Sequence, residues 1–273
     1  MPDEHANWVL RFEDVTLRFE DTVALDHVSF AVAAGETRVI LGAAGSGKTV
    51  LLKVALGLVK PDSGRVYLFG EETTSKKEQE LFDVRVRVGM LFQEGGLFDS
   101  QTIEENVAYP LRNQKLVRYS EAEIQQRVEE ALRFVELEHT LAKFPSELSG
   151  GMRRRVGIAR AIVTEPPLVL YDSPTAGLDP ITANTIIALL IKERELRNAT
   201  AIVVTHRYQD GQLLANFRYN SQNGQLIPAS EAGGRSDLRT TFMVMREGRL
   251  VFEGSQPELE SSKDPYVRKF VRR

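Results

Sequence analysis

The sequence predicts an α/β fold whose parallel β-sheet carries a glycine-rich loop suited to phosphate binding. Short apolar runs typical of buried strands alternate with helical stretches, which favours a parallel sheet with right-handed crossovers. The glycine-rich segment, residues 42–49, lies between one such strand and a helix. The 273 residues suffice for one large domain or for a core with an inserted subdomain. A composition of 42% hydrophobic and 27% charged residues is normal for a globular protein.

The first third of the chain is expected to form a small antiparallel sheet that leads into the strand before the loop. Apolar and polar residues alternate over residues 8–41, and the last four form a short apolar run. The apolar residues 50–56 predict a buried helix directly after the loop. A turn, a strand, a polar loop or short helix, and a further strand should follow, in that order, at residues 61–64, 65–69, 71–80 and 84–92.

The rest of the chain is expected to hold a helical insertion and then a return to alternating strands and helices. Helical periodicity extends from about residue 97 to 165 and is clearest over residues 121–137. Residues 216–240 are rich in Asn, Gln, Ser and Gly, which favours a polar insertion or loop. The other expected elements are strands at 168–172, 201–205 and 241–251, a helix at 182–194, and a charged helical tail at 257–273.

These elements predict one domain over residues 1–273 with three parts. Residues 1–96 and 166–255 form the core together with an N-terminal antiparallel β subdomain. Residues 97–165 form an inserted helical subdomain, and residues 256–273 form a C-terminal helical tail.

Charge and composition narrow the class of protein. A net charge of −3 argues against a nucleic-acid partner, because general nucleic-acid binders carry a basic excess. The absence of cysteine excludes disulfides and thiolate metal sites. No stretch approaches the roughly 18 apolar residues of a membrane span, and the acidic N-terminus is unlike a secretory signal. We therefore expect a cytoplasmic protein that only a partner would hold at a membrane.

Residues 42–49 fit the phosphate-binding pattern Gly-x4-Gly-Lys-Ser/Thr. The glycines let backbone N–H groups turn inward, so that these groups and the N-terminus of the next helix face the phosphates. Lys48 would reach the outer phosphates, and the Thr49 hydroxyl would ligate Mg²⁺. The alternative, a surface turn with an incidental lysine, does not explain the strand and helix on either side. The expected nucleotide-binding residues are Gly42, Ala43, Ala44, Gly45, Ser46, Gly47, Lys48, Thr49 and Val50.

Two further segments suit nucleotide chemistry. Asp172 ends an apolar strand, where a phosphate loop requires a carboxylate that holds Mg²⁺ directly or through water. Taken alone, such an aspartate is more often the cap of the next turn. Residues 148–152 fit a short signature that, in one ATPase superfamily, closes over the nucleotide of a neighbouring subunit. Within it, Ser149, Gly150 and Gly151 begin a helix, which suits anion binding.

On these motifs the chain resembles the ATP-binding subunits of ATP-binding-cassette (ABC) transporters over essentially its whole length. The resemblance implies the core fold of P-loop NTPases, with ATP and Mg²⁺ as cofactors. It implies a homodimer with two shared sites, in which residues 148–152 of one subunit face the ATP held by the other. It also implies an integral membrane permease as partner, which would hold the chain at the inner face of the cell membrane.

The resemblance implies roles for residues outside the three motifs. Phe19 falls where an aromatic ring stacks on adenine, although it could be an ordinary strand aromatic. Gln93 falls at the position that contacts Mg²⁺ and water and senses the permease. Asp179 lies in the loop that crosses the dimer interface, and His206 matches the histidine that contacts the γ-phosphate. Three consecutive arginines form either a solvated helix face or a contact to the second subunit or the permease: Arg153, Arg154 and Arg155.

A finer resemblance is to the ATPases of Mla-type, Mce-associated lipid transporters. It rests on residues 47–53, 90–98 and 106–111, and on Met152, where most cassettes have glutamine. The implied cargo is phospholipid or a related lipid moved between membranes. A small regulatory subunit and a lipid-binding Mce-type protein are further partners that this resemblance admits.

The sequence departs from the family at Ser173. Most active cassettes have glutamate directly after the Mg²⁺ aspartate, and a serine hydroxyl does not readily accept a proton from water near neutral pH. General-base help is worth roughly 10²–10⁴ in rate. Hydrolysis could instead rely on His206, Gln93 and the phosphate contacts, or on a substitute carboxylate such as Glu94. We expect slow but real hydrolysis, with Ser173, Gln93 and His206 at the catalytic positions.

Other functions remain open at the level of sequence. Ser173 would also suit an ATP-gated regulatory clamp with little hydrolysis. A soluble assembly-factor ATPase, as in iron–sulfur assembly, uses the same cassette. A membrane permease partner would favour transport, whereas a soluble scaffold partner would favour the assembly role.

Overall fold

The computed structural model describes residues 8–231 and 239–271, and its largest sheet has six strands in the order β12-β11-β3-β8-β7-β6. All neighbours in this sheet run parallel except β12, which is antiparallel to β11. The predicted α/β fold with a parallel sheet is therefore confirmed. The strands are β3 (Thr37–Gly42), β6 (Val88–Leu91), β7 (Leu168–Asp172), β8 (Thr200–Thr205), β11 (Thr240–Arg246) and β12 (Arg249–Gly254).

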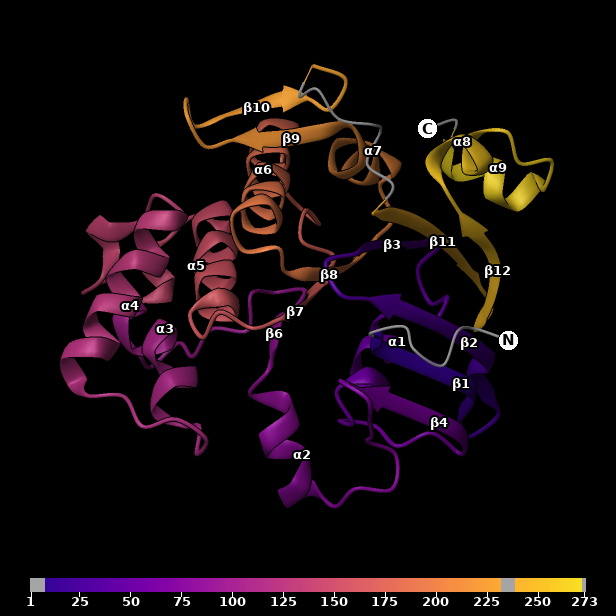
Figure 1. Ribbon diagram of the computed structural model, residues 1–273, viewed down its shortest axis with the longest axis horizontal. Helices are drawn as coiled ribbons and strands as arrows, with labels where there is room; N and C mark the ends of the chain where they lie inside the picture. Colours follow the sequence, from indigo (N-terminus) through magenta and orange to yellow (C-terminus); the bar gives the residue numbers. More distant parts are fainter. Residues whose placement is uncertain (1–7, 232–238, 272–273) are drawn as a thin grey trace.

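A second sheet of four antiparallel strands, in the order β2-β1-β4-β5, confirms the predicted N-terminal subdomain (Figure 1). The rings of Phe12 and Phe30 stack in its core. Helix α1 (Lys48–Ala55) inserts Leu51 and Leu52 into the same core, which it shares with one face of the six-stranded sheet. The strands are β1 (Trp8–Phe19), β2 (Thr22–Ala33), β4 (Ser63–Leu68) and β5 (Glu71–Glu72).

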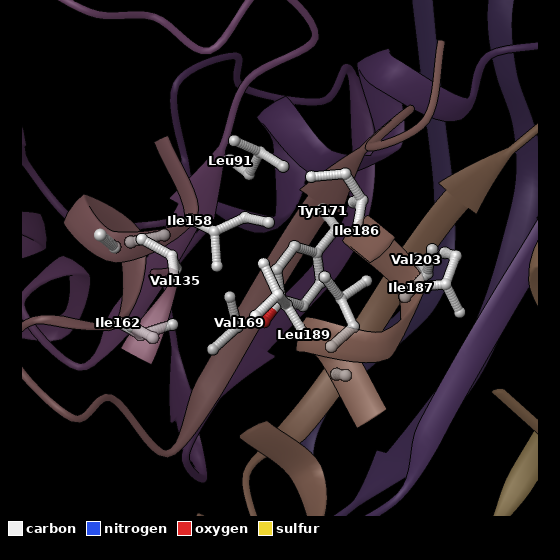
Figure 2. Close-up of a cluster of buried hydrophobic side chains, with 14 of the residues drawn as sticks. Leu91, Val135, Ile158, Ile162, Val169, Tyr171, Ile186, Ile187, Leu189 and Val203 are labelled. Atoms are coloured by element: carbon white, nitrogen blue, oxygen red, sulfur yellow. The ribbon is translucent and has the colours of Figure 1, made fainter. Parts of the chain in front are cut away.

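Helices cover the opposite face of the six-stranded sheet. Leu170 of β7 belongs to the core shared with α1, whereas Val169 and Tyr171 belong to the core on the helix side. Figure 2 shows this second core, where Tyr171 lies among Ile158, Ile186 and other aliphatic side chains. Both faces of the central strands are thus buried, as their uninterrupted apolar runs predict. The covering helices are α5 (Gly150–Ile162), α6 (Pro180–Arg197) and α7 (Tyr208–Asn216).

Helices α3 (Ile103–Arg112) and α4 (Glu121–Phe134) gather with α5 at one end of the molecule (Figure 1). The hydroxyls of Thr102 and Ser120 accept hydrogen bonds from backbone N–H groups of α3 and α4, which caps both helices. Two short 3₁₀ turns, Glu138–Thr140 and Pro145–Glu147, lead into α5. The helical character of this segment is confirmed, while the subdomain boundaries at residues 97 and 165 stay predictions.

The strand expected over residues 84–92 is wrong in its first part. Helix α2 (Glu78–Arg85) occupies the beginning of that segment, and β6 starts only at Val88. The buried residues of α2, Leu81 and Val84, are three positions apart, which is a helical spacing. A short apolar run does not distinguish a strand from the end of a helix, so the boundary was placed too early.

The polar segment at residues 216–240 contains a β-hairpin. Strands β9 (Phe217–Asn220) and β10 (Gln225–Pro228) pair antiparallel, and Gly224 closes their turn with a φ of 71°. Residues 232–238 of this segment lie outside the described residues. The predicted helical tail consists of α8 (Gln256–Glu260) and α9 (Pro265–Val271).

The two ends of the sequence, residues 1–7 and 272–273, also lie outside the described residues, so the expectation that rests on the acidic N-terminus stays a prediction. Among the residues that are described, no helix has both the length and the apolar character needed to cross a membrane.

Candidate nucleotide-binding site

Four candidate segments follow neighbouring parallel strands at the same edge of the large sheet. The glycine-rich loop follows β3, His206 follows β8, Asp172 ends β7, and Gln93 comes two residues after β6. These strands are adjacent in the order β3-β8-β7-β6. Because the carboxyl ends of parallel strands share one edge, the fold brings together residues that are far apart in sequence.

The glycine-rich loop is held in a conformation that only glycine suits at two positions. A Cβ atom on Gly42 would lie 2.4 Å from the Ser46 hydroxyl and 2.7 Å from the carbonyl oxygen of Met245. Gly47 has a φ of 101°, and a Cβ there would lie 2.4 Å from the carbonyl oxygen of Ala24. The neighbouring strands β11 and β2 therefore shape the loop, while its tip, residues 43–45, is exposed to solvent.

Lys48 folds back into the loop at the start of α1. Its ammonium group donates hydrogen bonds to the carbonyl oxygens of Gly42 at 2.9 Å and Ala43 at 2.7 Å, and to the Ser46 hydroxyl at 3.3 Å. Burial lowers the pKa of Lys48, and the negative charge of Asp172 opposes that shift. A cation, a helix N-terminus and an open loop tip thus converge on one place, which suits an anionic phosphate group.

The residues present fit a Mg²⁺ ion held together with phosphates. Asp172 is only 2% exposed, and the Ser173 hydroxyl donates to its carboxylate at 3.1 Å. Thr49 supplies a hydroxyl from the first turn of α1. Hard oxygen ligands of this kind are those Mg²⁺ prefers, and such sites use one or two protein oxygens beside substrate phosphates and water. Within the described residues, no three His, Cys, Asp or Glu side chains form a metal cluster of their own.

Ser173 occupies an unusual backbone conformation directly after Asp172. Its φ is 50°, in the left-handed region that non-glycine residues seldom adopt. Its N–H donates to the carbonyl oxygen of Val204 at 2.8 Å, which ties the turn to the neighbouring strand β8. The candidate catalytic residues Gln93 and His206 are both exposed at the same sheet edge.

Residues 149–152 of the predicted signature and Asp179 come together in a separate cavity of about 680 Å³. Gly151 makes this possible, because a Cβ there would lie 2.5 Å from the Thr182 methyl group at the start of α6. Ser149 caps α5 by accepting from the N–H of Met152, and Asp179 caps α6 by accepting from the N–H of Ile181. No residue of the phosphate loop, all of which is described, lines this cavity.

The Asp179 carboxylate also accepts from the Thr182 hydroxyl at 2.5 Å, and this bond lowers the pKa of Asp179. Phe19 lies at the end of β1, at the tip of the β1–β2 hairpin, with 48% of its surface exposed. Strand β2 of that hairpin touches the phosphate loop at Ala24.

Sequence reasoning missed two groups that fix the loops of this edge. Asp210 of α7 is buried and accepts from the Thr175 hydroxyl at 2.6 Å and from the Thr205 hydroxyl at 2.7 Å. It thereby joins the loop after Asp172 to the end of β8. Of the three consecutive arginines, Arg154 is only 8% exposed, so a solvated helix face is wrong for that residue. No pattern in the sequence marks an acidic residue in a helix, or one arginine of three, as buried.

The model of the ABC transporter family matches residues 25–176. The chain belongs to the ABC transporter family. ATP and Mg²⁺ are accordingly its cofactors, and the ABC resemblance inferred from the motifs is confirmed.

Two curated relatives of this ABC chain cover it to different extents. The methionine import ATP-binding protein MetN of Rhizobium johnstonii is 40% identical over 74% of this chain and 55% of that protein. The intermembrane phospholipid transport system ATP-binding protein MlaF of Haemophilus influenzae is 32% identical over 97% of this chain and 90% of that protein. The ABC chain thus spans about half the length of the MetN relatives it matches.

Solved ABC structures share the fold. A dimeric ATP-binding cassette bound to ADP and Pi in a post-hydrolysis state is 30% identical, covers 90% of this chain and 98% of its own, and superimposes with a TM-score of 0.74. CbiO1 from Clostridium perfringens, part of an ABC transporter complex, is 29% identical with a TM-score of 0.75, and the match covers 97% of this chain and 96% of CbiO1.

Proposed function

We propose that this chain is the ATP-hydrolysing subunit of an ABC transporter that moves phospholipid through a membrane permease. The observation that carries the proposal is the division of the nucleotide chemistry between two places. The phosphate loop and Asp172 share one sheet edge, whereas the signature residues and Asp179 line a different cavity. Each place holds half of a site, so two copies of the chain are needed to complete one.

In the proposed mechanism, the phosphate-loop N–H groups and the α1 N-terminus bind the phosphates, and Lys48 moves its ammonium from the loop carbonyls to the outer phosphates. Thr49 and Asp172 would hold Mg²⁺, which supplies charge neutralisation at the transferred phosphate when bound. Gln93 and His206, at the same edge, orient the attacking water. Ser173 offers that water a hydroxyl in place of a carboxylate.

The second copy would bring Ser149, Gly150 and Gly151 to the exposed phosphates. Ser149, Gly150 and Gly151 lie at the N-terminus of α5 and line the cavity, and a helix N-terminus suits an anion from outside the chain. Asp179, at the start of α6, would cross the same interface. A homodimer with two shared sites follows from this arrangement.

A groove beside Gln93 supports a permease partner. The cavity of about 620 Å³ is lined mostly by apolar residues of α2, β6, α3 and the loop after β6, including the exposed rings of Phe82, Phe92, Phe98 and Tyr109. Arg85 and Arg160 are among its polar lining residues. An exposed apolar groove of this size suits a helix of a partner protein. We propose that a cytoplasmic helix of the permease sits there and holds the chain at the inner face of the membrane.

The phospholipid cargo rests on the relative that covers most of the chain. MlaF matches 97% of this chain and 90% of its own length, whereas MetN, at higher identity, matches 55% of its own length. A regulatory subunit and an Mce-type lipid-binding protein are additional partners in this proposal. An ATP-gated clamp with little hydrolysis is the second candidate, and Ser173 is the observation that favours it.

Purification of the chain with its membrane partners tests the proposal. The complex should contain an integral membrane protein, carry phospholipid and release phosphate from Mg–ATP, whereas Lys48→Ala should abolish ATP binding. Methionine bound in place of lipid would favour the importer class of MetN. A soluble partner alone would contradict transport, and ATP binding without phosphate release would favour the clamp.

A further inference from the structure

Arg154 is a buried arginine whose guanidinium bridges two loops. Its Nη1 donates to the carbonyl oxygen of Phe92 at 3.3 Å, and its Nη2 donates to the carbonyl oxygen of Ala176 at 3.3 Å. Phe92 precedes Gln93 in the loop after β6. Ala176 lies in the loop after β7, between Ser173 and Asp179. One side chain of the signature helix α5 therefore contacts both loops.

Other contacts hold each loop separately. Arg160, also on α5, donates to the carbonyl oxygens of Gly96 at 2.6 Å and Gly95 at 3.2 Å, so it fixes only the loop after β6. Asp210 accepts from the Thr175 hydroxyl at 2.6 Å and from the Thr205 hydroxyl at 2.7 Å, so it ties the loop after β7 to the end of β8 and does not reach the loop after β6. Arg154 is distinguished from these groups because its two hydrogen bonds join the loop after β6 to the loop after β7.

The electrostatic surroundings retain the charge of Arg154 in this buried position. Burial lowers the pKa of its guanidinium, and the carboxylates of Asp172 and Glu94 oppose that shift. Glu94 lies on the loop after β6, and Asp172 ends β7. The two loops thus each have a neighbouring acidic residue that attracts the same cation.

Guanidinium geometry suits a rigid bridge. Its donors are fixed in one plane, so two nitrogens can bind two acceptors at a set separation. Lysine keeps the charge, but its single ammonium on a flexible stem does not hold two carbonyls in a fixed relation. With arginine at residue 154, a displacement of one loop would therefore move the other loop. With lysine at that position, the second loop would not follow.

We propose that Arg154 is a positioning residue that couples the loop of Gln93, which faces the permease groove, to the loop of Ser173 and Asp179, which faces the second subunit. The coupling rests on the proposed function, because it would link the conformation of the permease to the sheet edge at which ATP is hydrolysed. This proposal gives a role to Arg154, the middle one of the three consecutive arginines, for which the sequence alone left two interpretations open.

Hydrogen exchange on the nucleotide-free chain tests the coupling without ATP. Gly177 has a φ of 73° and open space at its Cβ, so Gly177→Ala strains and loosens the loop after β7. We expect faster amide exchange at residues 173–179 and, through Arg154, at residues 92–96. In the Arg154→Lys background the faster exchange should stay at residues 173–179. Gly70→Ala, with a φ of 82° and equally open space, is the matched control and should change neither loop.

Turnover supplies the second readout. We expect Arg154→Lys to lower kcat about tenfold while ATP affinity, measured with a fluorescent ATP analogue, changes less than about twofold. Arg112→Gln, which removes an exposed arginine of α3, should change neither quantity. Arg154→Gln should behave like Arg154→Lys; because the lysine variant keeps the charge, it decides the test if the glutamine variant does not fold.

The inference is overturned if residues 92–96 respond to Gly177→Ala equally with Arg154 and with lysine, or if they do not respond at all. An unchanged kcat in Arg154→Lys would equally contradict it. A wild-type chain that does not hydrolyse ATP would contradict the proposed function instead, and the exchange result would still decide whether the two loops are linked.

Discussion

At the scale of single residues, we propose that Ser173 limits the rate at which this ABC chain hydrolyses ATP. Its hydroxyl donates to Asp172 at 3.1 Å, so the side chain is engaged with the carboxylate that would hold Mg²⁺. The left-handed backbone at this position does not exclude a longer side chain. Glu136 and Glu165 adopt a similar φ, of 61° and 52°, elsewhere in the chain. A carboxylate could therefore be placed at residue 173 without a new backbone conformation.

Ser173→Glu should raise the turnover of ATP by about 10²-fold or more, because it restores a general base beside Asp172. Steady-state phosphate release from the assembled complex is the measurement. Ser173→Ala is the control, which removes the hydroxyl without adding a base and should be no faster than the wild type. A fast wild type that Ser173→Glu leaves unimproved would contradict the assignment.

A second residue, Glu193 of α6, is a glutamate whose side chain is buried. Both of its carboxylate oxygens lack a hydrogen-bond partner, and Arg197 approaches one of them at 3.6 Å. Burial raises the pKa of Glu193 to about 7 from an ordinary value of 4.5, with Glu165 raising it further and Arg197 and Lys192 opposing. Between these two pH values, Glu193 is therefore protonated in the folded state and ionised in the unfolded state.

The free energy of unfolding should therefore fall as pH rises from about 4.5 to about 7. At about 1.4 kcal/mol per pKa unit, the full effect is about 3 kcal/mol above that range. Urea unfolding at about pH 5 and about pH 8 should show Glu193→Gln gaining about 2–3 kcal/mol on the wild type between the two conditions. If the free energy of unfolding changed with pH equally in the wild type and in Glu193→Gln, the raised pKa of Glu193 would be contradicted.

At the scale of elements, the approach of α5 to α6 forms the signature cavity. Gly151 lies in the first turn of α5, and Thr182 lies in the first turn of α6. The contact between them places Ser149 and Asp179, each the cap of its helix, around one space. The predicted signature thus has a structural role, the close packing of two helix N-termini, in addition to its proposed role in binding.

Gly151→Ala should destabilise the fold by about 1–2 kcal/mol, because the new Cβ meets the Thr182 methyl group at 2.5 Å. Denaturant unfolding measures this loss. Thr182→Ser removes that methyl group and keeps the hydroxyl that bonds Asp179, so the double variant should recover most of the loss. A single variant as stable as the wild type would show that the two helices are free to separate.

Much of the fold could be predicted from local pattern, and the remainder depended on tertiary contacts. The apolar runs that end at Asp172 and Thr205 were located correctly, because strands buried on both faces have a strong signal. Part of helix α2 falls in the strand predicted from residue 84, because Leu81 and Val84 are too few to establish a helical period. The composition of residues 216–240 predicts a polar insertion or loop and not the β9–β10 hairpin, although the dipeptide Asn223-Gly224 is a hairpin signal.

The candidate site, like the fold, could be predicted where local motifs mark it and not where it depends on tertiary contacts. Motifs locate the phosphate loop, Asp172 and the signature, whereas the division between a sheet edge and a separate cavity is implied by the family resemblance and by no local pattern. Arg154 and Asp210 were missed as fixing groups because their role depends on backbone carbonyls and hydroxyls from other loops. Such partners are set by packing and leave no periodic trace in the sequence.

At the scale of the whole molecule, one copy presents two incomplete halves of a nucleotide site. The phosphate loop of one copy would meet the signature of a second, so ATP itself would join the two subunits. Without nucleotide, the chain should be a monomer, or at most a weak dimer. Association of the two copies should therefore depend on ATP.

Mixing two inactive variants tests this ATP-dependent association most directly. Lys48→Ala disables the phosphate loop and leaves the signature, whereas Ser149→Arg blocks the signature and leaves the phosphate loop. Each variant alone should remain monomeric with Mg–ATP in analytical ultracentrifugation. The mixture has one intact composite site, so it should form a heterodimer that retains one ATP. A mixture that stays monomeric, while the wild type dimerises with ATP, would contradict the shared site.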